Sequence, residues 1–155
     1  MRTGLLISTL LLGCLSLPSV VARPAVENAQ RANLMGTWAL SCTAAASPSN
    51  YKALYYATAY GELRRRVDRG SDLPPLNVVV ESVDIINATT VRLRFRNADP
   101  NWGNWNGDAY TAVLQKRSNC WFTLSFATDD GTVHIKDGYF TADGKPAPLL
   151  EQCPD

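Results

Sequence analysis

The clearest alternation of hydrophobic and polar positions lies at residues 91–96, which read Val-Arg-Leu-Arg-Phe-Arg. A period of two places the three apolar side chains on one face of a strand and the three arginines on the other. The preceding segment, residues 76–86, is rich in Val and Ile, which favour strands over helices. Its alternation shifts near Glu81 and Ser82, which predicts a strand that carries a bulge.

Other short apolar or aromatic runs alternate with turn residues at hairpin spacing, at residues 34–43, 51–60, 63–69, 108–116, 120–127, 132–136 and 139–142. The second and third of these fit a hairpin around Gly61, while a helix through residues 52–66 is the competing interpretation. The tail at residues 145–153 is interrupted by prolines, so we expect it to lie across the domain without pairing as a strand. This pattern predicts an all-β fold, an antiparallel up-and-down barrel of about eight strands.

The first 22 residues differ from this pattern. They combine Arg2, an apolar run at residues 5–17, and the small-x-small sequence that ends at Ala22. This combination predicts a signal peptide cleaved after Ala22, and therefore a secreted or periplasmic protein without a membrane span. Residues 23–33 are polar and Ala-rich and predict an extended arm or a single loose helical turn. Residues 34–155 then form a single β-domain.

Residues 11–14, Leu-Leu-Gly-Cys, also resemble a bacterial lipobox, in which Cys14 would become the lipid-anchored first residue of a lipoprotein. The apolar run continues through residues 15–17, whereas a lipoprotein tether usually turns polar after its cysteine. Cleavage after Ala22 is therefore the favoured interpretation, and a lipid anchor at Cys14 is the alternative.

Three cysteines remain after cleavage, namely Cys42, Cys120 and Cys153, and export would place them where disulfides persist. Three pairings are possible. The pair Cys42–Cys153 closes the longest loop and so constrains the unfolded chain most. Cys120 lies in an apolar run, where a buried free thiol is a comfortable core residue. We therefore predict a Cys42–Cys153 disulfide and a free Cys120.

Charge and candidate chemistry exclude several functions. The chain carries a net charge of +1, which offers no long-range field to attract nucleic acid. His134 is the single histidine and is expected to face solvent from its strand, so neither a zinc site nor any other cofactor is predicted. No nucleophile or phosphate-loop motif is present, and we predict that the protein is not an enzyme. Arginines 64–66 and the arginines of residues 92–96 could meet as an anion-binding patch, although the solvent face of a strand is the favoured interpretation.

The opening strand, with Gly36-Thr37-Trp38, resembles the lipocalin and wider calycin pattern. That resemblance implies that Trp38 packs across the closed end of a barrel whose open mouth receives a small apolar ligand. The chain is also similar to small exported bacterial proteins of unknown role. They share this opening, a cysteine four residues after the Trp, the loop at residues 99–103 and a C-terminal cysteine. This second likeness implies fold and export but no activity.

These observations predict an exported, non-enzymatic β-barrel that binds a small apolar or amphipathic ligand. The candidate binding residues are Trp102 and Trp105, in an Asn- and Gly-rich loop suited to stacking, together with Tyr55 and Tyr56. The alternative is a protein-interaction module, either an inhibitor of a hydrolase or an envelope-associated adaptor, that uses the Trp102/Trp105 loop.

Overall fold

The computed structural model describes residues 24–98 and 109–154. One short helix, α1 (Pro24–Arg31), precedes ten strands. The strands are β1 (Gly36–Ala39), β2 (Lys52–Ala57), β3 (Leu63–Asp68), β4 (Leu76–Asn87), β5 (Thr90–Asn97), β6 (Ala109–Arg117), β7 (Cys120–Thr128), β8 (Val133–Lys136), β9 (Tyr139–Phe140) and β10 (Leu149–Gln152).

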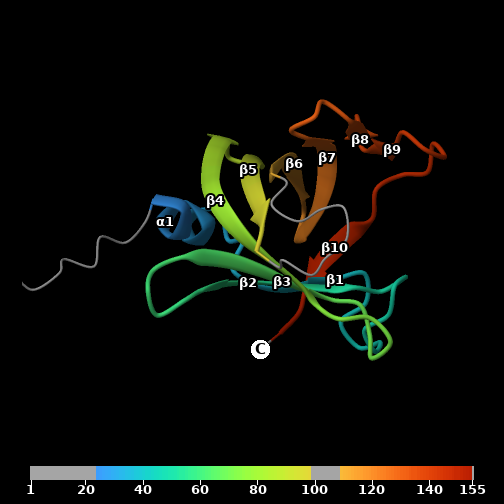
Figure 1. Ribbon diagram of the computed structural model, residues 1–155, viewed down its shortest axis with the longest axis horizontal. Helices are drawn as coiled ribbons and strands as arrows, with labels where there is room; N and C mark the ends of the chain where they lie inside the picture. Colours follow the sequence, from blue (N-terminus) through green and yellow to red (C-terminus); the bar gives the residue numbers. More distant parts are fainter. Residues whose placement is uncertain (1–23, 99–108, 155) are drawn as a thin grey trace, which may run out of the picture.

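The strands form a closed antiparallel barrel (Figure 1). Strands β1 to β7 pair in chain order, and β10 completes the ring because it pairs with β1 on one side and with β7 on the other. The ring therefore has eight strands, which confirms the predicted fold class. Strands β8 and β9 continue from β7 as a separate extension and are not part of the closed ring.

The C-terminal segment is a strand, so the prediction of an unpaired tail is wrong. Pro146 and Pro148 precede β10 and leave its four residues free to donate backbone hydrogen bonds. Leu150 lies opposite Trp121 of β7, and Gln152 lies opposite Trp38 of β1. The tail is thus the strand that closes the barrel.

The disulfide prediction is confirmed. Cys42 and Cys153 are bonded, with their Cα atoms 5.2 Å apart across 111 positions of sequence. The bond joins the segment after β1 to the residue that follows β10, beside the seam where these strands meet. Within the described ranges, Cys120 is a free cysteine and is half-buried. The bond therefore secures the closing seam.

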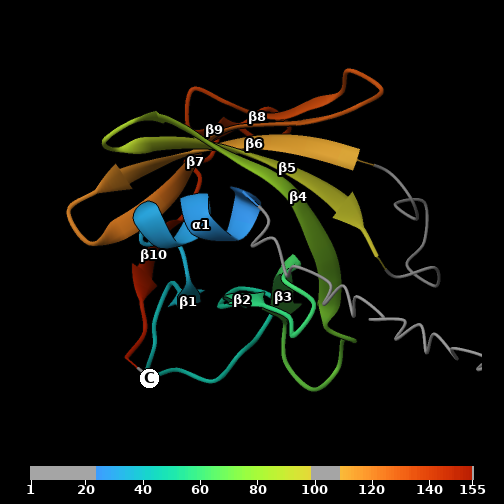
Figure 2. The same cartoon turned by 90° about the vertical axis from the view of Figure 1, so that its left-hand side faces the viewer.

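The segment predicted as an extended arm or a single loose turn contains a helix of eight residues, α1. Pro24 suits the first helical position, since its fixed φ angle is already helical. Ala25, Val26 and Ala29 are buried in the barrel core, and the Asn28 side-chain amide donates to the Val83 carbonyl at 2.7 Å. Figure 2 shows α1 across the barrel, between β4 and β1. A helix of eight residues is too short to be stable alone, so its packing against the barrel stabilises it.

The predicted hairpin and bulge are both present. Strands β2 and β3 pair across a turn in which Gly61 has a φ of 73°, so the alternative helix through residues 52–66 is wrong. Strand β4 shifts its register against β5 between Val80 and Ser82, where the sequence pattern shifts. The resulting core contains inward-facing side chains from each of the strands β1 to β7.

Candidate ligand-binding cavity

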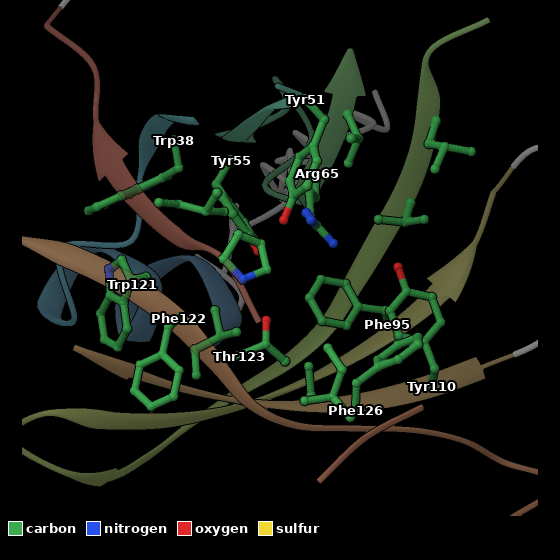
Figure 3. Close-up of a pocket in the computed structure, with 18 of the residues that line it drawn as sticks. Trp38, Tyr51, Tyr55, Arg65, Phe95, Tyr110, Trp121, Phe122, Thr123 and Phe126 are labelled. Atoms are coloured by element: carbon green, nitrogen blue, oxygen red, sulfur yellow. The ribbon is translucent and has the colours of Figure 1, made fainter. Parts of the chain in front are cut away.

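An internal cavity of about 380 Å³ lies inside the barrel (Figure 3). Each of the ten strands contributes at least one side chain to its lining. The apolar lining residues include Leu34, Trp38, Val78, Phe95, Leu114, Trp121, Phe122, Phe126, Ile135, Phe140 and Leu150. The lining residues with polar atoms include Tyr51, Tyr55, Arg65, Arg69, Asn97, Tyr110 and Thr123. The cavity is therefore mainly apolar, with a small set of polar groups.

Two buried tryptophans contribute to the lining. The rings of Trp38 and Trp121 meet edge to face, with their centroids 6.4 Å apart. The Trp38 indole Nε1 donates to the Leu34 carbonyl at 2.8 Å, which fixes the ring against the segment that follows α1. Leu34 and Trp38 are 1% and 2% exposed, whereas Phe140 is 37% exposed. The cavity thus extends from the core beneath Trp38 to the molecular surface at β9.

Stacked aromatic rings form one wall. Phe95 of β5 stacks on Tyr110 of β6 at 4.8 Å, and Tyr110 meets Phe126 of β7 edge to face at 5.0 Å. These side chains come from adjacent strands at paired or neighbouring register positions, so the sheet itself sets their spacing. Aromatic contacts of this geometry add rigidity to the wall beyond the burial of their area.

Arg65 brings a positive charge into the cavity. It lies in β3 between Leu63 and Val67, which are both buried, and so belongs to the inward-facing set of that strand. Its guanidinium carbon lies 5.6 Å from the centroid of the Tyr55 ring and 5.7 Å from that of Phe95, within the range of cation–π attraction. Figure 3 shows the guanidinium between Tyr51 and Phe95. A single basic side chain is thus held among aromatic rings.

The phenols around Arg65 stay protonated at neutral pH. Burial raises the pKa of Tyr55 to about 12, although the charge of Arg65 opposes the shift. Burial also raises the pKa values of Tyr51 and Tyr110 against the same opposing charge. Burial lowers the pKa of Arg65, but the three tyrosines together outweigh that effect, so Arg65 remains a cation. The surroundings of Arg65 therefore combine its positive charge with three neutral phenol hydroxyls.

The candidate site residues are only partly brought together. Tyr55 is 5% exposed and lines the cavity. Tyr56 follows it on β2, points to the other side of the strand and is not among the lining residues. Ligand binding by either tyrosine stays a prediction. Trp102 and Trp105 lie outside the described residues. The expectation that His134 faces solvent is wrong, because its ring is half-buried and lies 5.2 Å from the ring of Phe126.

The two arginine runs do not form one anion-binding patch. Arg94 is paired with Asp129 and Glu81, and Arg96 is paired with Glu81. Arg64, on the outer side of β3, is paired with Glu62 at 2.9 Å. Strand pleating directs Arg65 to the opposite side, into the barrel. Arg64, Arg94 and Arg96 are therefore paired with carboxylates. Arg65 is the cavity residue that the sequence pattern did not single out.

Two further findings concern only the part of the chain that the structure covers. No three or more His, Cys, Asp and Glu side chains gather there in an arrangement that could hold a metal ion. No helix there is both long and apolar enough to span a membrane.

Fold and site together define a disulfide-closed, eight-stranded antiparallel barrel with an internal aromatic cavity that contains a basic group. Comparison of this chain with protein-family models, with curated proteins and with solved structures gives no match.

Proposed function

We propose that the protein is an exported, non-enzymatic β-barrel that binds a small apolar or amphipathic molecule inside its barrel. The observation that carries this proposal is the cavity of about 380 Å³, mainly apolar and lined by aromatic rings. Its volume lies within the range of about 300–1,000 Å³ typical of small-molecule sites, which also combine an apolar lining with a few placed polar groups.

Side chains do not fill this barrel, although they fill many barrels of eight strands. Small residues at inward positions help to keep the space open. Ala112, between the lining residues Tyr110 and Leu114 on β6, contributes only a methyl group to the wall. A ligand in this space would exchange water for dense contact with ring faces, which is the main source of affinity for apolar molecules.

The disulfide supports the proposed export of the chain. Disulfides persist in oxidising compartments such as the periplasm and the extracellular space, and they are rare in the cytosol. The Cys42–Cys153 bond is compatible with that location. The alternative function, a protein-interaction module, depends on Trp102 and Trp105, which lie outside the described residues.

A larger side chain placed in the cavity tests the proposal. Ala112→Phe places a ring into the space, while Ala57→Phe adds the same ring at an exposed position of β2 as a matched control. Native mass spectrometry of the protein from its own host should show a bound small molecule in the wild type and in Ala57→Phe, and none in Ala112→Phe. Circular dichroism verifies that all three proteins fold. Absence of any bound molecule from the wild type, together with no binding of added apolar probes, would contradict the proposal.

A further inference from the structure

Arg65 has no carboxylate partner among the residues that the structure describes. The ion pairs within the described ranges join Arg64 to Glu62, Arg94 and Arg96 to outer carboxylates, and Lys145 to Asp143. The Arg65 Nε atom is fully buried and makes no hydrogen bond. A buried cation without a counter-charge is costly, and structures usually pair it.

The surrounding groups stabilise the guanidinium only in part. Tyr55 and Phe95 lie near it at cation–π distances, and Tyr110 is hydrogen-bonded to it. Ring faces attract a cation but cannot accept the directional hydrogen bonds of its N–H groups as an anion does. The Trp121 indole Nε1, another lining donor, is also buried without a partner. Arg65 and Trp121 therefore each present a buried N–H group to the cavity without an acceptor.

We propose that the ligand is an amphipathic monoanion, an organic carboxylate whose head binds Arg65 and the neighbouring tyrosine hydroxyls while its apolar body lies against the aromatic lining. This inference rests on the proposed function and specifies the class of ligand. It assigns Arg65 as the residue that selects an acid over a neutral molecule of the same shape.

Charge and shape both favour a carboxylate. One guanidinium neutralises one negative charge, and its planar fork matches the two oxygens of a carboxylate. A phosphate monoester carries close to two charges at neutral pH and would leave the second one in an apolar space. Arg69, which also contributes to the lining, is half-exposed and donates to the Pro74 carbonyl at 2.9 Å. Arg69 follows the end of β3, and this hydrogen bond holds its guanidinium to the loop that precedes β4.

Isothermal titration calorimetry with matched acids and amides tests the inference. The probes are decanoate and 2-naphthoate, each compared with its primary amide, which keeps the shape and lacks the charge; decyl phosphate is the dianion. We expect the wild type to bind at least one acid tenfold or more tighter than its amide and tighter than decyl phosphate. Arg65→Met should remove that preference while amide binding persists. Arg66→Met, at the exposed neighbouring position of the same strand, should leave the preference unchanged.

Each outcome has a distinct meaning. Equal binding of acid and amide by the wild type, or tighter binding of decyl phosphate, would overturn the inference and leave the proposed function in place. Retention of the acid preference by Arg65→Met would overturn the assignment of Arg65. Binding of no acid and no amide would contradict the proposed function itself. The comparison of acid with amide in the wild type needs no variant, so misfolding of Arg65→Met cannot obscure the result.

Discussion

Removal of the Cys42–Cys153 bond should cost a large part of the folding free energy. The perturbation is the double substitution Cys42→Ser and Cys153→Ser, made in a Cys120→Ser background so that no other disulfide can form. The bond spans 111 positions of sequence. For a closed loop of that size, the chain-entropy relation gives a stabilisation of about 5 kcal/mol at 25 °C.

Urea unfolding followed by circular dichroism measures this loss. With a slope of about 1.5–2 kcal/mol per molar urea, a loss of about 4–5 kcal/mol lowers the unfolding midpoint by about 2–3 M. The Cys120→Ser protein is the control and should unfold close to the wild-type midpoint, because its thiol forms no disulfide. A loss below about 1 kcal/mol in the variant without the bond would refute the reasoning that the bond acts by restricting the unfolded chain.

Three further predictions concern the lining of the cavity. Arg65→Met should raise the free energy of unfolding of the ligand-free protein by about 1–2 kcal/mol in urea titrations, because replacing a buried charge with an apolar side chain removes its desolvation cost. Trp38→Phe should lower the free energy of unfolding by about 2 kcal/mol, since the buried Leu34 carbonyl loses its hydrogen-bond donor. Tyr55 ionises at about 10 when unfolded and at about 12 when folded, so it stabilises the fold below pH 10 and loses that effect as the pH rises towards 12. The melting temperature should therefore fall between about pH 9 and pH 11 more steeply in the wild type than in Tyr55→Phe, and equal slopes would contradict this origin.

Much of the barrel could be predicted from the sequence, because apolar and polar residues alternate along a strand that has one face in the core and one face in solvent. Residues 91–96 form the centre of β5, and the shift in alternation near Ser82 corresponds to the bulge of β4. Two elements escaped prediction because tertiary contacts create them. The segment of α1 is helical through its packing on the barrel, and β10 is a strand because β1 and β7 offer it two edges.

The site was harder to predict than the fold. Tyr55 and Tyr56 are adjacent and both aromatic, so the run gives no indication of which one faces inward. Pairing of Tyr55 with Gly36 across β1 and β2 fixes that choice, and it depends on the register of the whole sheet. Arg65 did leave a signal, since it alternates with Leu63 and Val67, but a charged side chain is normally assigned to the wet face of a strand.

The closing role of β10 also determines when the barrel can exist. Strands β1 to β7 are made before β10. Until β10 arrives they form an open curved sheet in which the edge of β1 and the edge of β7 at residues 120–122 lack their partner. Such edges bind other strands readily, so a nascent chain at this stage is prone to aggregate. Strand β10 both completes the hydrogen bonding of the ring and brings Cys153 to Cys42. For a chain proposed to cross a membrane, this order delays closure of the barrel until β10 has been translocated, and it makes a truncation before residue 149 a predicted aggregation mutant.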